Sequence, residues 1–85
     1  MKPIPEVPQT AEAVKNMREA LRLSQRGLQE VLGLGNRAIS LIENGRADAR
    51  VVVVKSLVLM LEREGIDPYA AAEGEVRPLY RGPGA

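Results

Sequence analysis

Two short apolar patterns joined by a glycine-containing turn constrain this chain more than any other feature of its sequence. Apolar residues within 28–32 recur at the spacing of one helix face, after Ser24, a favoured N-cap, and before Gly33, which tolerates the left-handed conformation of a helix end. A second periodic segment follows at 38–42 and stops before Gly45. Two helices of about two turns each, separated by so few residues, predict a helix-turn-helix arrangement.

Three further helices are predicted around this pair. An apolar face and the N-cap candidate Thr10 predict a helix over about residues 10–22. The segment 51–64 begins with four valines, which favour a strand, but its unbroken length of about 14 residues favours a helix. Asp67 followed by Pro68 has the form of an N-cap and first-turn proline, which predicts a last short helix.

The predicted organisation is one all-α domain of five helices with a short tail on each side. Residues 1–9 contain three prolines and predict an extended N-terminal arm, residues 10–73 form the helical domain, and residues 74–85 are a C-terminal tail or short strand. A chain of 85 residues buries a modest core, so association of two copies would add to its stability.

Residue types that the sequence lacks disfavour several classes of function. There is no cysteine and no histidine, so a disulfide framework, a thiolate metal site and the commonest general base are all excluded. We expect no metal and no other cofactor, and an enzyme is the weakest interpretation. The sequence has no apolar run of about 18 residues and no signal-peptide core, which predicts a cytoplasmic protein without membrane contact.

Charge is distributed unevenly along the chain. Residues 14–59 carry eight basic and four acidic side chains, whereas residues 60–75 carry one basic and five acidic side chains. The basic part is suited to face a polyanion while the acidic part faces away. An ordinary solvated surface is the alternative explanation.

A specific pattern occupies residues 22–46. Its elements in order are Leu23-Ser24-Gln25, Leu28, Leu32-Gly33, Ile39-Ser40 and Ile42-Glu43-Asn44-Gly45-Arg46. At this spacing they resemble the helix-turn-helix domains of the Cro and phage-repressor type, often called the Xre family, over about residues 12–66. The resemblance implies a five-helix, lambda-repressor-like bundle that binds double-stranded DNA, usually as a homodimer.

The resemblance also implies a recognition helix over about residues 36–44, whose first turn enters the major groove. Arg37 can bond guanine and Asn36 can bond adenine, and each such pair discriminates by roughly 1–3 kcal/mol. Ser40 lies one turn further on, within reach of a base or a phosphate. Leu41 could pack on a thymine methyl group. These four residues are the predicted base contacts.

Three other residues are predicted to contact DNA phosphates. Gln25 lies at a helix N-terminus, where backbone N–H groups and the helix dipole suit a phosphate oxygen. The resemblance implies that Gln25, Asn44 and Arg46 all meet the DNA backbone. Glu43 is expected to make internal hydrogen bonds instead, because a carboxylate is repelled by phosphate.

The segment 51–64 has more apolar residues than one buried face requires. The residues expected to cover the core are Val51, Val54, Leu57, Val58 and Leu61. The residues left over, which form the predicted homodimer interface, are Val52, Val53, Leu59 and Met60. The alternative is that the C-terminal segment folds back over this patch, through Tyr69, Val76, Leu79 and Tyr80.

The leading functional interpretation is a sequence-specific DNA-binding transcriptional regulator, acting as a dimeric repressor or autorepressor. The alternative is an antitoxin that binds DNA and also neutralises a toxin partner, to which its C-terminal segment would add a strand. A third interpretation is a protein-interaction module without DNA binding, against which Gln25, Arg37 and Arg46 argue.

Overall fold

The computed structural model describes residues 7–79, and this part of the chain is all-α, as predicted. Its five helices are α1 (Ala11–Ala20), α2 (Gln25–Leu32), α3 (Ala38–Glu43), α4 (Val51–Arg63) and α5 (Pro68–Ala72). Most of the predicted N-terminal arm, together with Tyr80 and the residues after it, lies outside the described residues. None of the helices within residues 7–79 has the length and apolarity needed to cross a membrane.

Local capping interactions and the residues Gly33 and Pro68 set the ends of several helices. Thr10, Ser24 and Asp67 each accept a backbone N–H from the first turn of the following helix, at 2.9–3.0 Å. Such a cap stabilises a helix by about 1 kcal/mol relative to alanine. Gly33 ends α2 in the left-handed conformation, with a φ of 65°. Pro68 occupies the first turn of α5, where its missing N–H costs nothing.

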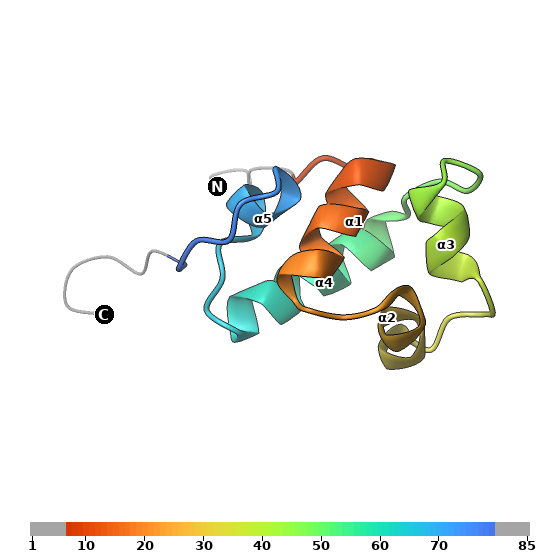
Figure 1. The fold of residues 1–85 in the computed structure, drawn as a ribbon, viewed down its shortest axis with the longest axis horizontal. Coiled ribbons are helices and arrows are strands. Elements are labelled where there is room, and N and C mark those ends of the chain that lie inside the picture. The colour runs from red at the N-terminus through yellow and green to blue at the C-terminus, as the bar shows by residue number, and fades with distance from the viewer. Residues whose placement is uncertain (1–6, 80–85) are drawn as a thin grey trace, which may run out of the picture.

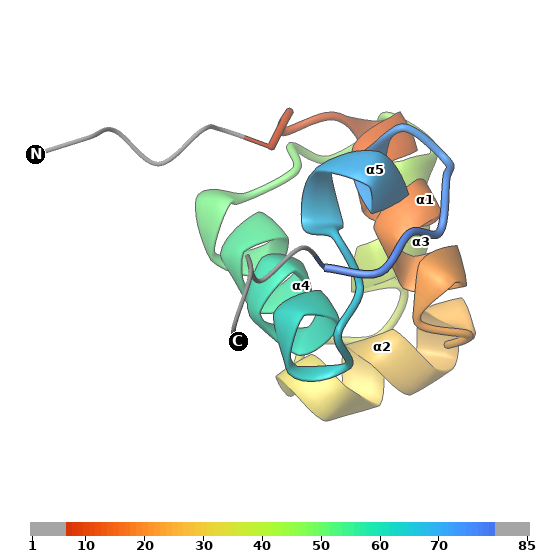
Figure 2. The ribbon, with the colours of Figure 1, turned by 90° about the vertical axis from the view of Figure 1, so that its left-hand side faces the viewer.

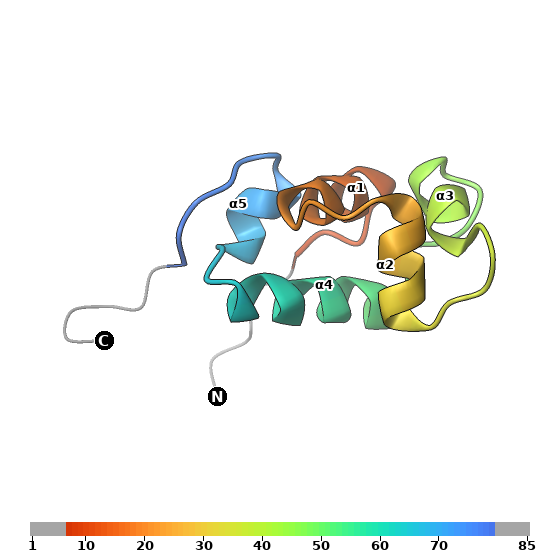
Figure 3. The same cartoon turned by 60° about the horizontal axis from the view of Figure 1, so that its bottom comes forward.

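The helices are arranged around a central pair. α1 and α4 pack along each other, with α3 at one end of the molecule and α5 at the opposite end (Figure 1). Viewed from that α5 end, α4 lies on one side of α5 and α1 on the other (Figure 2). α2 crosses the end of the α1–α4 pair beside α3 (Figure 3). The chain between residues 25 and 43 therefore occupies one end of the molecule.

The core is continuous through all five helices. The largest fully buried side chains are Met17, Leu28, Ile39, Leu57, Leu61, Val14, Val53 and Pro68. Val7, in the segment before α1, is also buried against this cluster, with 8% of its surface exposed.

The predicted orientation of α4 is partly wrong. Val53 is buried, with 2% of its surface exposed, although it was expected in the exposed patch. Val51, expected in the core, is 47% exposed. Val53, Leu57 and Leu61 are spaced four residues apart and so share one helix face, which is the face turned to the core. The β-branched run at the start of α4 has no periodicity of its own from which this orientation could be read.

The exposed side of α4 nevertheless carries apolar side chains. Val52 and Leu59 are 62% and 63% exposed, whereas Met60 is partly buried and packs against the core. Val52 and Leu59 are seven residues apart, two helical turns, and so lie on one face.

The described part of the C-terminal segment pairs with the loop after α4. The N–H of Leu79 donates to the carbonyl oxygen of Gly65 and the N–H of Asp67 donates to that of Arg77, both at 2.8 Å. These bonds flank one antiparallel bridge between Ile66 and Pro78. The segment thus runs along the loop, and it leaves Val52 and Leu59 uncovered.

Candidate functional site

Helix α3 is held against the molecule by its apolar side. Ile39 and Ile42 are buried, with 0% and 4% of their surfaces exposed, and α3 packs against both α1 and α2. Because these two residues are three positions apart, they fix one side of this six-residue helix to the core. The polar residues before and after α3 are left at the surface.

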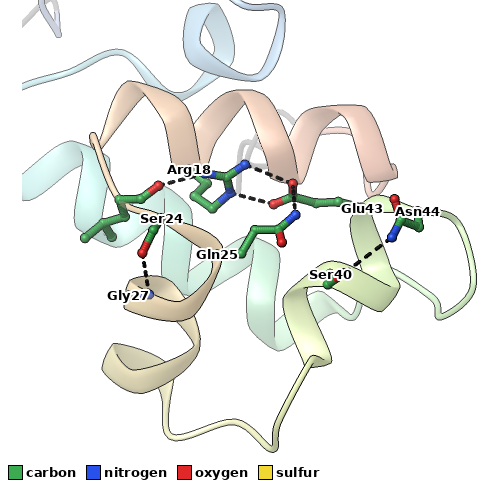
Figure 4. A network of polar contacts seen from close by, with 8 residues as sticks. Arg18, Ser24, Gln25, Gly27, Ser40, Glu43 and Asn44 are labelled. Carbon is green, nitrogen blue, oxygen red and sulfur yellow. Dashed lines mark hydrogen bonds and ion pairs between the residues drawn. The ribbon is translucent and has the colours of Figure 1, made fainter.

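A polar network centred on Glu43 joins three elements at this end of the molecule (Figure 4). Arg18 of α1 donates from Nε to Glu43 Oε2 at 2.6 Å and from Nη2 to Glu43 Oε1 at 3.0 Å. Gln25, the first residue of α2, donates from Nε2 to Glu43 Oε1 at 3.0 Å. Arg18 Nη1 also donates to the carbonyl oxygen of Leu23 at 2.7 Å. The network ties α1, the start of α2 and the end of α3 together.

This ion pair is well shielded from solvent. The side chains of Arg18 and Glu43 are only 11% and 4% exposed. Burial raises the pKa of Glu43, but hydrogen bonds from Arg18 and Gln25, with the positive charges of Arg18 and Lys15, outweigh it, so the pKa lies below its ordinary value. The hydrogen bond to Glu43 raises the pKa of Arg18 despite its burial. Both groups are therefore charged at neutral pH.

The expected internal role of Glu43 is confirmed by these bonds. Its partner Arg18 is not among the residues predicted from the sequence, where it is one of the eight basic side chains of residues 14–59. Arg18 lies four residues after the buried Val14 and one residue after the buried Met17, close to the apolar face of α1. A charged residue beside an apolar face was the available signal.

The start of α2 offers backbone donors to an anion. Ser24 Oγ accepts the N–H of Gly27, but the N–H groups of Gln25 and Arg26 have no acceptor within the helix. The side-chain amide nitrogen of Gln25, Nε2, donates a hydrogen bond to Glu43. A contact between Gln25 and a phosphate stays a prediction.

Helix α3 is shorter than the predicted 36–44. It begins at Ala38, so Asn36 and Arg37 lie in the turn before it, and both are exposed. Arg37 adopts a φ of 65° and provides no side-chain cap. The left-handed conformation costs a non-glycine residue about 1–2 kcal/mol, and such strain often marks functional positions.

The end of α3 and the loop after it hold the other predicted contacts. Ser40 and Leu41 are half-buried, and Asn44 Nδ2 donates to Ser40 Oγ at 3.3 Å. The N–H groups of Arg46 and Ala47 both donate to the carbonyl oxygen of Leu41, at 2.8 and 3.1 Å. The backbone of Arg46 is thereby fixed while its side chain is exposed.

Comparison with known protein families matches residues 14–64 to a family described as helix-turn-helix. The match covers more than half of the chain, including all of α2, α3 and α4. No match was found among curated proteins or among solved structures.

Proposed function

We propose a repressor function from one premise: the chain belongs to the family of Xre-, Cro- and lambda-repressor-type helix-turn-helix domains, and is a DNA-binding transcription regulator. The proposal is that two copies bind one specific site on double-stranded DNA and block transcription there. The promoter of the protein's own gene is the proposed target.

One observation carries the sequence-specific part of this proposal. Asn36 and Arg37 are exposed directly before a helix that is buried on its other side and fixed at its end by the bonds of Glu43. Side chains in a turn that leads into a firmly held helix can be matched to base edges, because the helix restricts where the turn lies before DNA binds. We assign base reading to Asn36 and Arg37, with Ser40 and Leu41 beside them.

Phosphate contacts are proposed on both sides of this helix. The start of α2 supplies backbone N–H groups, and Asn44 and Arg46 follow the end of α3. Positive charge accompanies them, since the exposed basic residues from the end of α1 to the start of α4 are Arg22, Arg26, Arg37, Arg46 and Arg50. Such charges supply the affinity that depends on salt, whereas base contacts supply specificity.

A homodimer is proposed through the exposed face of α4. Val52 and Leu59 leave an apolar surface that the described C-terminal segment does not cover. A second copy would bring the same apolar surface and bury both. Two copies related by a twofold axis would present two recognition helices to half-sites about one helical turn of DNA (~34 Å) apart.

Binding to labelled duplexes tests the proposal. One duplex carries the sequence upstream of the protein's own gene, and the other carries a scrambled sequence of equal composition. Both are titrated at about 50 and about 200 mM salt, the range over which affinity from phosphate contacts falls steeply. We expect two chains per upstream duplex, tighter binding than to the scrambled duplex, and a steep loss of affinity at the higher salt. Equal affinity for both duplexes would overturn the sequence-specific function.

A further inference from the structure

We propose that two copies of this chain associate by reciprocal docking, in which Leu59 of each copy enters a pocket beside α4 of the other. This inference rests on the proposed function, whose dimer interface it specifies. It assigns an occupant, a second copy of this chain, to a pocket that lies outside the proposed DNA contacts.

The pocket lies between the last turns of α4 and the end of α1. It has a volume of about 260 Å³ and is lined by Leu21, Leu23, Met60, Arg63 and Glu64. Leu21 caps the end of α1 and Leu23 follows it, whereas the other three residues belong to α4 and its C-cap. The lining therefore combines three apolar side chains with one positive and one negative side chain.

The size of this pocket favours a side chain as its occupant. A cavity of about 150 Å³ is large enough to hold benzene, so about 260 Å³ accommodates the branched end of a leucine. Pockets for small-molecule ligands usually measure about 300–1,000 Å³. The pocket is smaller than that range, which disfavours a small-molecule effector.

An exposed apolar side chain lies next to the pocket on the same helix. Leu59 directly precedes Met60 and shares a helix face with Arg63, four residues further on, and it is 63% exposed. In a contact about a twofold axis, whatever the first copy inserts into the second, the second inserts into the first. A protruding leucine beside a hollow satisfies this condition, because each copy supplies one of each. Docking buries both apolar surfaces.

The charges beside the pocket complement those of a second copy. Glu62, Arg63 and Glu64 are consecutive and exposed, and none of them forms an ion pair with another residue of 7–79. When Leu59 of the second copy occupies the pocket, its Glu62, on the next turn of the helix, comes close to Arg63 of the first. The twofold axis repeats this pair of opposite charges. Exposed ion pairs add little affinity, so these contacts select the orientation of the two copies.

Substitutions at Leu59, followed by sedimentation equilibrium, test the docking. Leu59→Ala shortens the side chain that enters the pocket, whereas Leu59→Met keeps its approximate volume. We expect Leu59→Ala to raise the dissociation constant of the dimer at least about 100-fold, because both copies lose three buried carbon atoms, worth about tenfold or more per copy. Leu59→Met should raise it by about tenfold or less. Val51→Ala, an exposed site eight residues away on the same helix, is the matched control and should leave the constant unchanged.

Cross-linking identifies what occupies the pocket. The chain has no cysteine, so each introduced cysteine reports a single position. The Leu59→Cys and Leu23→Cys proteins are mixed, one of them labelled with nitrogen-15, and treated with a short thiol-to-thiol cross-linker. We expect mass spectrometry to find mainly linked pairs of one labelled and one unlabelled copy, because reciprocal docking places position 59 of one copy beside position 23 of the other. Circular dichroism confirms that each variant is folded.

The outcomes separate this inference from the proposed function. A dimer that Leu59→Ala does not weaken would overturn the docking and leave the proposed dimer standing. The same holds for a dimer in which Leu59→Cys links to its own kind and not to Leu23→Cys. An unaltered chain that sediments as a monomer, and binds the upstream duplex as one chain, would overturn both the docking and the proposed dimer.

Discussion

Replacing Glu43 by glutamine tests the role of the buried ion pair in stability. Glu43→Gln keeps the shape of the side chain but leaves the charge of Arg18 without its partner, at a side chain only 11% exposed. Breaking a buried pair by removing one partner costs about 3–5 kcal/mol. We expect the lower end, about 3 kcal/mol, because Arg18 keeps its bond to the carbonyl oxygen of Leu23 and the new amide oxygen still accepts one bond.

That loss is large for a chain of 85 residues. Domains are stabilised by roughly 0.05–0.15 kcal/mol per residue, or about 4–13 kcal/mol in total for this length. A destabilisation of 1 kcal/mol lowers the melting temperature of so small a domain by about 4–8 °C. The Glu43→Gln variant should therefore melt about 12–24 °C below the unaltered chain at pH 7.

The same pair makes this difference depend on pH. Because the pKa of Glu43 in the folded protein lies below its ordinary value, ionised Glu43 stabilises the fold above that ordinary value. The contribution is lost as the pH falls through the lowered pKa. Glutamine does not titrate, so the free energies of unfolding of the two proteins should converge in acid.

Urea unfolding followed by far-ultraviolet circular dichroism, at pH 7 and pH 3, measures both effects. The matched control is Glu30→Gln, which alters an exposed pair with Arg26 at 3.6 Å and should cost less than about 1 kcal/mol. The double variant Arg18→Met/Glu43→Leu removes both charges and should recover most of the loss. A Glu43→Gln loss below about 1 kcal/mol at pH 7, or one that is unchanged at pH 3, would refute the reasoning.

Three further predictions concern the proposed interface with DNA and the dimer. Arg37→Ala should raise the dissociation constant for the upstream duplex by about 5- to 150-fold, equivalent to about 1–3 kcal/mol, and hardly change that for a scrambled duplex; equal losses on both would contradict base reading. Arg46→Ala should weaken binding to both duplexes and reduce the slope of log affinity against log salt by about 1, and an unchanged slope would remove Arg46 from the phosphate contacts. Leu59→Asp should shift sedimentation equilibrium from dimer to monomer with an unchanged circular dichroism spectrum, since Leu59 is 63% exposed, whereas a dimer that persists would place the interface elsewhere.

The helices themselves could be predicted from the sequence because their signals are local. Thr10, Ser24 and Asp67 sit directly before the turns whose N–H groups they accept, and Gly33 lies at the left-handed end of α2. Each such signal needs only three or four neighbouring residues to act. The family pattern of residues 23–46 placed the third helix, observed as α3, in the right region for the same reason.

Features that depend on distant residues were harder to predict. Val51 and Val53 have the same chemistry, and only packing against the rest of the core decides which of them is buried. The partner of Glu43 is Arg18, 25 positions away in sequence, and no periodicity connects the two. The left-handed conformation of Arg37 is equally invisible, because arginine carries no preference for it. The positions of the predicted DNA-contacting residues are now described, and their contacts with DNA remain predictions.

The pairing of residues 77–79 with the loop after α4 fixes the position of the C-terminal end of the described chain. The N–H of Leu79 donates to the carbonyl oxygen of Gly65, in the loop that leads into α5, and α5 lies at the end of the molecule opposite α3 (Figure 1). A second domain joined after Leu79 would thus start at the end of the molecule opposite the proposed DNA contacts of α3. This holds for a fluorescent protein, an effector domain or a surface anchor. Attachment at that point would let the domain be tethered, or built into a longer polypeptide, with its access to a duplex intact.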